Sequence, residues 1–193
     1  MRRIAGGARL EAYSAEAGSL VERARLGDRA AIGDLYADLA PGVIGYMRGA
    51  GARDPEDLAG DVFLSMVRGL PDFEGDEAAL RRWVFTIAHH RLIDMRRRET
   101  VRAVESPLTG NDDCPVVADP YDGVLDRLGA APAVRALAQL TPEQRDVLLL
   151  RSVVGLSISD TASVLQRTPG STKTIHRRAI AALSRLVDRE AVS

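Results

Sequence analysis

One stretch past the middle of the chain lacks the periodicity of a helix or a strand, and it limits the fold more than any other part. Between residues 100 and 130, prolines interrupt any helix and acidic residues outnumber basic ones. Segments of this composition have too few apolar residues to form a core. We therefore predict a flexible acidic linker at residues 100–130, which divides the 193-residue chain into two small domains.

Both flanking segments have the spacing of helices. Asp54-Pro55 and Thr141-Pro142 have the form of a cap followed by a proline at the first helical position, and Gln144 completes a capping box in the second case. Aromatic residues make up only 4% of the chain, which favours thin helical cores over sheets. We predict an all-α protein whose parts are an N-terminal extension at 1–18, a helical domain at 19–99 that ends in a helix over 78–99, the linker, and a second helical domain at 131–193.

Charge is segregated along the chain, although the net charge is only −1. Residues 81–98 have six arginines and one acid, and residues 166–189 have six basic residues and one acid. Residues 54–77, in contrast, have eight acids and one arginine. Two basic patches separated by acidic surface indicate two contacts with nucleic acid and a third surface of opposite charge.

The C-terminal segment has the spacing of a helix-turn-helix. Ser157 begins a short helix, Gln166 and Arg167 form a turn, and Thr168-Pro169 begin a longer helix. On a period of 3.6 residues, the apolar side chains of the longer helix share one face. Its other face has small and basic residues, which can reach base edges and phosphates in the major groove. The residues predicted to contact duplex DNA are Ser171, Lys173, Thr174, Arg177 and Arg178.

The last helix predicted in the N-terminal domain has one apolar and one basic face. Arg82, His89 and Arg96 are spaced by sevens and are predicted to lie on the basic face beside Phe85. Cationic side chains bind phosphates, and unstacked bases stack on aromatic rings, so this face suits a separated DNA strand. Trp83 falls on the apolar face and is expected to be a core residue rather than a base platform.

These motifs resemble those of the extracytoplasmic-function (ECF) group of RNA polymerase sigma factors. Residues 83–94, followed by Arg96-Arg97-Arg98, are similar to the minus-ten region of that group, and residues 54–63 are similar to its polymerase-binding helix. The spacing of its minus-thirty-five reading domain is matched by Leu156, Ser157, Ala162, Leu165, Gly170, Lys173, Arg178, Ala179 and Leu183. The resemblance implies a factor that binds core RNA polymerase and directs promoter recognition and transcription initiation without doing chemistry itself.

The resemblance also implies roles for individual residues. The minus-ten strand would contact a basic helix face and a loop that takes a flipped base, formed by Phe73, Glu74, Asp76, Arg82, Phe85, His89, Arg96 and Arg97. The polymerase would contact an acidic face with an exposed leucine, formed by Asp57, Asp61, Leu64 and Arg68. The implied partners are the clamp and flap regions of core RNA polymerase and promoter DNA. An anti-sigma factor is a further partner that the sequence leaves open, and no cofactor or metal is implied.

The chain departs from the family pattern at several positions. Gly60 replaces a usual glutamine in the polymerase-binding helix, and Asp160, Thr161 and Gln166 replace glutamate, isoleucine and glycine. Ser171-Thr172 stands where threonine-valine is usual. The changes in the C-terminal domain leave the predicted fold intact but prevent a prediction of the promoter sequence. Gly60 weakens one polymerase contact that the resemblance implies.

Two other functions fit parts of the sequence. An enzyme could be built on a metal held by His90 and Asp94, which are one helical turn apart, but His89 points elsewhere and no third ligand, nucleophile or phosphate-binding loop is evident. An autonomous helix-turn-helix regulator would need only the C-terminal domain and would bind duplex DNA by itself, commonly as a dimer. The basic and acidic helices of the N-terminal domain favour the sigma factor.

The location expected from the sequence is the cytoplasm. The N-terminus has no apolar run of signal-peptide length, and no later segment is long and apolar enough to insert into a membrane. The single cysteine, Cys114, offers neither a disulfide framework nor a cysteine-rich metal site.

Overall fold

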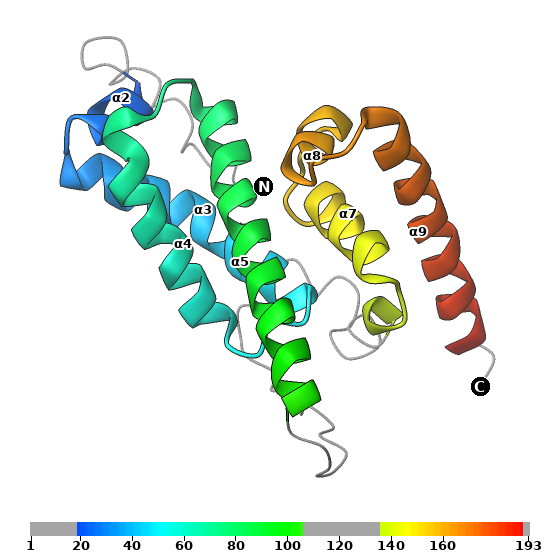
Figure 1. Ribbon diagram of the computed structural model, residues 1–193. Coiled ribbons are helices and arrows are strands. Elements are labelled where there is room, and N and C mark those ends of the chain that lie inside the picture. Colours follow the sequence, from blue (N-terminus) through cyan, green and yellow to red (C-terminus); the bar gives the residue numbers. More distant parts are fainter. Residues whose placement is uncertain (1–18, 106–135, 191–193) are drawn as a thin grey trace, which may run out of the picture.

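The computed structural model describes residues 19–105 and 136–190, and all regular elements within those ranges are helical (Figure 1). The first range contains α2 (Leu20–Arg25), α3 (Arg29–Gly49), α4 (Pro55–Gly69), the 3-10 turn η1 (Leu70–Asp72) and α5 (Glu77–Glu105). The second range contains α7 (Pro142–Ser152), α8 (Ile158–Val164) and α9 (Pro169–Glu190). The prediction of an all-α protein with two helical domains is confirmed.

Most of the helix starts follow from local hydrogen bonding. At α7, the Thr141 hydroxyl accepts from the Gln144 N–H and the Gln144 side chain accepts from the Thr141 N–H, so the predicted capping box is present. At α4, Asp54 occupies the predicted cap position, but its side chain makes no capping hydrogen bond. The prediction of a side-chain cap at Asp54 is therefore wrong, and Pro55 begins the helix without it.

Helix α5 continues to Glu105, past the end expected at Glu99. Neither proline nor glycine occurs between these residues, so the chain has no local reason to leave the helix there. The remainder of the predicted linker and the predicted N-terminal extension lie outside the described residues.

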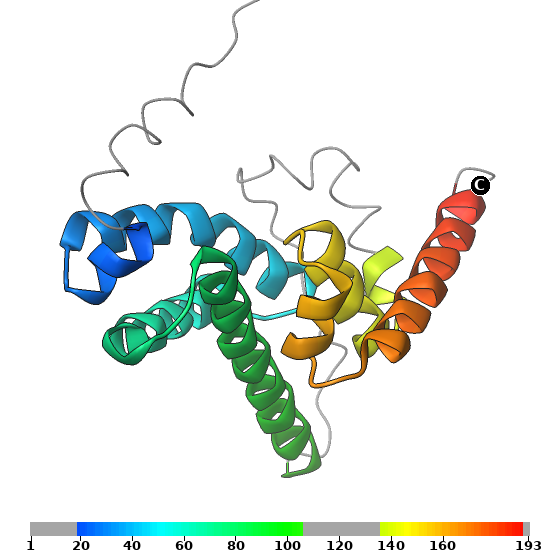
Figure 2. The same ribbon diagram turned by 90° about the horizontal axis from the view of Figure 1, so that it is seen from above.

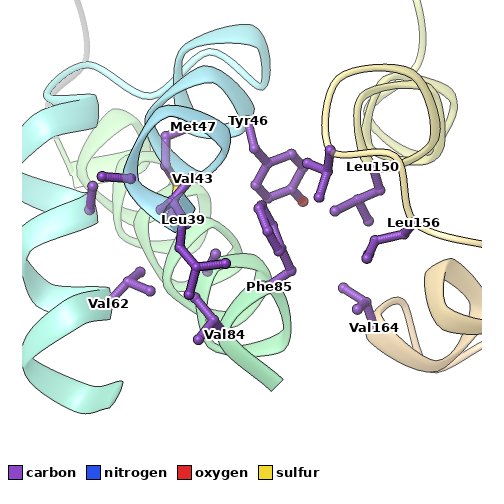
Figure 3. Packing of buried hydrophobic residues seen from close by; sticks show 14 of the residues in the cluster. Leu39, Val43, Tyr46, Met47, Val62, Val84, Phe85, Leu150, Leu156 and Val164 are labelled. Atoms are coloured by element: carbon purple, nitrogen blue, oxygen red, sulfur yellow. The ribbon is translucent and has the colours of Figure 1, made fainter. Parts of the chain in front are cut away.

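The two helical domains pack against each other, an arrangement that the sequence did not predict. Helix α5 lies between α4 on one side and the C-terminal helices on the other, and α8 contacts α5 while α7 contacts α3 (Figures 1 and 2). Buried apolar side chains of both domains form one continuous cluster. At its centre the rings of Tyr46 and Phe85 point toward Leu150, Leu156 and Val164 of the C-terminal domain (Figure 3).

A glycine permits a close approach between the domains. A Cβ atom at Gly49, at the end of α3, would lie only 2.6 Å from Cδ2 of Leu149 in α7. Any side chain at position 49 would therefore displace Leu149, which is itself almost fully buried.

None of the helices in the described ranges combines the length and apolarity needed to cross a membrane.

Candidate nucleic-acid interface

The loop before α5 is held by stacking and by a helix cap. The Phe73 ring stacks on Trp83 with centroids 5.1 Å apart and planes 26° apart. The Asp76 carboxylate accepts a hydrogen bond of 2.8 Å from the Ala79 N–H, so it caps α5. Glu74 is exposed between them. The loop proposed to take a flipped base thus has a fixed position on the N-terminal end of α5.

Trp83, together with the absence of a side chain at Gly69, holds this loop in position. Trp83 is half-buried and packs against the apolar cluster, as expected for a core residue, while its ring also carries Phe73. A Cβ atom at Gly69 would lie 2.9 Å from the Trp83 ring, so the absence of a side chain there allows the indole to seat against α4. Trp83 therefore positions the loop through Phe73.

Phe85 is a core residue, and its predicted place on the polar face of α5 is wrong. Its side chain is fully buried, and its ring meets Tyr46 edge-on with centroids 6.2 Å apart. The prediction assumed that α5 buries a single face. The helix instead packs against its own domain through one face and against the C-terminal domain through another, so its buried residues cover a wider arc: Leu80, Val84, Phe85, Ala88, His89 and Leu92.

The basic row predicted on α5 exists, and carboxylates of the C-terminal domain occupy it. Arg82 Nη1 lies 3.0 Å from Oδ1 of Asp160 at the start of α8. Arg96 donates two hydrogen bonds, of 2.9 and 3.0 Å, to the two carboxylate oxygens of Asp146 in α7. Asp146 is only 4% exposed, and this paired geometry compensates for the burial of its charge.

His89 lies between these two ion pairs and is also buried. Its Nδ1 is 2.9 Å from the Tyr46 hydroxyl and 4.0 Å from Asp146 Oδ2. Burial lowers the pKa of His89, although the charge of Asp146 acts in the opposite direction. Burial, together with the same carboxylate, raises the pKa of Tyr46 well above its ordinary value. A protonated Tyr46 hydroxyl can therefore donate to a neutral imidazole.

The carbonyl at the end of α3 joins the two domains. Ala50 is the C-cap of α3, and its oxygen accepts from Arg96 Nη2 at 3.0 Å and from Arg145 Nη1 at 3.5 Å. Arg145 belongs to α7 and also donates to the carbonyls of Leu137 and Ala138. One main-chain acceptor at the negative end of a helix dipole thus binds a guanidinium from each domain.

The surface predicted to read duplex DNA is open to solvent. Thr168 caps α9 by accepting from the Ser171 N–H at 3.2 Å, after a turn in which Gln166 has a positive φ of 52°. Thr172 and Ala179 are buried on the inner face of α9. Of the predicted contact residues, Lys173, Arg177 and Arg178 are exposed, and Ser171 and Thr174 are half-buried.

The predicted polymerase-binding residues form an exposed stripe along α4, which we call the α4 stripe: Asp57, Asp61, Leu64 and Arg68. Leu64 is 56% exposed. A Cβ atom at Gly60 would meet no atom within 4 Å, so the missing glutamine leaves open space on this helix.

Sequence reasoning missed the residues that cover α5. Asp146 precedes a run of buried apolar residues, and an acid in such a position is a signal for a buried charge pair. Asp160 and Gln166 depart from the family pattern, and Gln166 belongs to the predicted turn, but the sequence indicates no contact of either residue with α5. In the structure, Asp160 pairs with Arg82, and the Gln166 side chain lies 3.2 Å from His90 Nε2. Arg97 remains exposed, and no group of three metal-ligating side chains occurs within the described ranges.

Comparison with known proteins identifies both domains. Residues 34–102 match the family described as Sigma-70 region 2, and residues 132–183 match Sigma-70, region 4. The chain is 32% identical over 180 residues to the ECF RNA polymerase sigma factor BldN of Streptomyces coelicolor, covering 92% of this chain and 68% of BldN.

The chain belongs to the ECF group of RNA polymerase sigma factors. As a sigma factor it binds RNA polymerase and recognises promoters, which decides against the autonomous regulator considered above.

Solved structures support the fold of this sigma factor. The structure of CnrH in complex with the cytosolic domain of CnrY has a TM-score of 0.65 and 25% identity, and the match covers 88% of this chain and 96% of CnrH. The sigma factor RpoE from Bartonella quintana, in complex with the anti-sigma factor NepR, has a TM-score of 0.58 and 21% identity over 80% of this chain and 97% of RpoE.

Proposed function

We propose that three separate surfaces of this sigma factor carry out promoter recognition. The α4 stripe docks on the clamp of core RNA polymerase, and the C-terminal domain docks on the flap. The basic row of α5, with Arg97 and the Phe73–Asp76 loop, captures the unwound minus-ten strand. The exposed face of α9 reads the minus-thirty-five duplex. The part of the predicted linker beyond Glu105 would let the two domains reach both DNA elements.

One observation carries this assignment: the two basic surfaces lie on different domains and differ in chemistry. The α9 face has exposed cations and small polar side chains at the start of the second helix of a helix-turn-helix, which suits base edges in a major groove. The α5 region combines the cations Arg82, Arg96 and Arg97 with a stacked aromatic pair. This combination suits unpaired bases and their phosphates. The α4 stripe is acidic and contains an exposed leucine, so it suits a protein rather than DNA.

The proposal extends to the setting in which the factor acts. It initiates transcription in the cytoplasm through polymerase and performs no catalytic step itself. An anti-sigma factor is a proposed partner, because the similar fold of RpoE occurs in a complex with one.

In vitro transcription tests the proposal. Core polymerase alone, the purified protein alone and the two together are compared on a library of genomic promoter fragments. We expect specific transcripts only from the combination. Tight, sequence-specific binding of duplex DNA by the purified chain without polymerase, or no gain of specific transcripts with polymerase, would refute it.

A further inference from the structure

The C-terminal domain covers part of the surface that the proposed function assigns to the minus-ten strand, namely the basic row of α5. Arg82 and Arg96 are paired with Asp160 and Asp146, and His89 is 8% exposed beneath them. The α4 stripe and the cations of α9 are exposed in the same arrangement. The closed packing of the domains therefore covers the α5 part of the proposed minus-ten surface, leaves Arg97 and Glu74 exposed, and leaves the other two proposed surfaces accessible.

The carboxylates of Asp146 and Asp160, which pair with the α5 arginines, bind a guanidinium in the same way as a DNA phosphate does. A guanidinium binds a carboxylate and a phosphate through the same paired N–H donors, and Arg96 uses both of its terminal nitrogens on Asp146. A DNA phosphate could form the same paired contact with Arg96 only after Asp146 has left, and at Arg82, whose side chain keeps 40% exposure, it would compete with Asp160. Asp160 and Gln166, which contact α5, stand at positions where this chain departs from the family pattern.

Apolar packing reinforces these polar contacts. Leu149 lies against the bare backbone of Gly49, and Tyr46 and Phe85 face Leu150 across the domain junction (Figure 3). Separation of the domains would expose part of this buried apolar surface to water, which opposes opening. The closed arrangement therefore has both a charge contribution and a hydrophobic one.

We propose that the C-terminal domain is an intramolecular inhibitor of strand capture, in which Asp146 and Asp160 bind the α5 arginines in place of DNA phosphates. This inference rests on the proposed function of α5. Only the open fraction of molecules can bind a separated strand, so the apparent affinity falls in proportion to that fraction. Docking through the α4 stripe requires no opening, so polymerase binding can precede domain separation.

Two variants weaken the closed state without changing a proposed DNA or polymerase contact. Gly49→Leu inserts a side chain against Leu149, and Asp146→Asn removes the charge that Arg96 binds. Gly33→Leu and Asp34→Asn are matched controls, because position 33 faces open space and Asp34 is exposed on the same helix. Gly49→Ala is the milder replacement if the leucine variant does not fold.

The experiment measures opening and strand binding on the full-length chain. In a Cys114→Ser background, dyes on Ala37→Cys and Ser184→Cys, both exposed positions, report domain separation by energy transfer. Fluorescence anisotropy measures binding of a labelled, random-sequence single strand of about 30 nucleotides. We expect Gly49→Leu and Asp146→Asn to lower the transfer efficiency and to tighten strand binding about tenfold, as a tenfold rise in the open fraction requires.

The gain should disappear when Arg96→Ala is added to Gly49→Leu, and the control variants should behave as wild type. The inference is overturned if neither variant lowers the transfer efficiency, or if the domains separate and strand binding does not improve. Transcription by wild-type protein with core polymerase is measured in parallel. If wild-type protein with core polymerase gave no specific transcripts, the proposed function would be contradicted. The energy-transfer result tests the closed state independently of that activity.

Discussion

Replacing Arg96 with alanine should destabilise the protein far more than replacing its neighbour Arg97. The Asp146 side chain is 6% exposed and loses both of its hydrogen bonds to a guanidinium when Arg96 is removed. Breaking a buried ion pair from one side costs about 3–5 kcal/mol. The Arg96 side chain keeps 25% exposure, and separation of the domains would rehydrate Asp146, so we expect a loss of about 2–3 kcal/mol.

Urea unfolding followed by circular dichroism measures this loss. With a denaturant slope of about 2 kcal/mol/M, the midpoint should fall by roughly 1–1.5 M for Arg96→Ala. Arg97 is exposed, so Arg97→Ala should change the free energy of unfolding by less than about 0.5 kcal/mol. Replacing both partners, as Arg96→Met with Asp146→Leu, should restore more than half of the loss, because no buried charge remains unpaired. Equal midpoints for Arg96→Ala and Arg97→Ala would refute the reasoning.

Three further predictions concern polymerase, DNA and pH. Asp61→Lys should weaken association with core polymerase in a pull-down titration while helicity stays unchanged, since Asp61 is exposed on α4; unchanged affinity would count against the α4 stripe. Arg177→Ala should reduce transcription by about ten- to a hundredfold in a way that depends on the minus-thirty-five sequence. A template premelted across the minus-ten element should rescue Arg96→Ala but not Arg177→Ala. Equal rescue of both variants would mean that the two helices are wrongly assigned. Burial lowers the pKa of His89 below its ordinary 6.5 in the closed state, so the open state binds the proton more tightly. Acidification from about pH 8 to about pH 5.5 should therefore decrease the energy transfer of the labelled protein, and His89→Gln should reduce that response.

Local sequence signals predicted the helices and their starts, because capping depends on residues three or four positions apart. The capping box of Thr141 with Gln144 and the cap at Thr168 are examples. The exposed face of α9 also followed from the 3.6-residue period. These features need no information about the rest of the chain.

The junction between the domains could not be predicted in this way. Phe85 follows Val84 directly, so a helix with one apolar face cannot bury both residues centrally, and the second buried face appears only once the C-terminal domain is in place. Asp146 and Arg96 are 50 residues apart in sequence, and neither residue by itself indicates the partner of the other. Pairing between distant segments depends on the shapes of both surfaces, which a local pattern does not contain.

The Ala50 carbonyl has a consequence for how this junction is studied by mutagenesis. An oxygen of the main chain is present whichever residue stands at position 50, so no side-chain substitution there deletes the acceptor. Arg96 and Arg145 both donate to it, and after loss of one donor the other still satisfies the oxygen. An alanine scan of the interface would therefore not isolate this acceptor, because Arg96→Ala also removes the partner of Asp146 and Arg145→Ala leaves Arg96 in place. Replacing the amide between residues 50 and 51 by an ester weakens that carbonyl as an acceptor and also removes the Gly51 N–H that donates to the Arg48 carbonyl. Comparison of this ester in wild type and in Arg145→Ala would show the contribution of the oxygen.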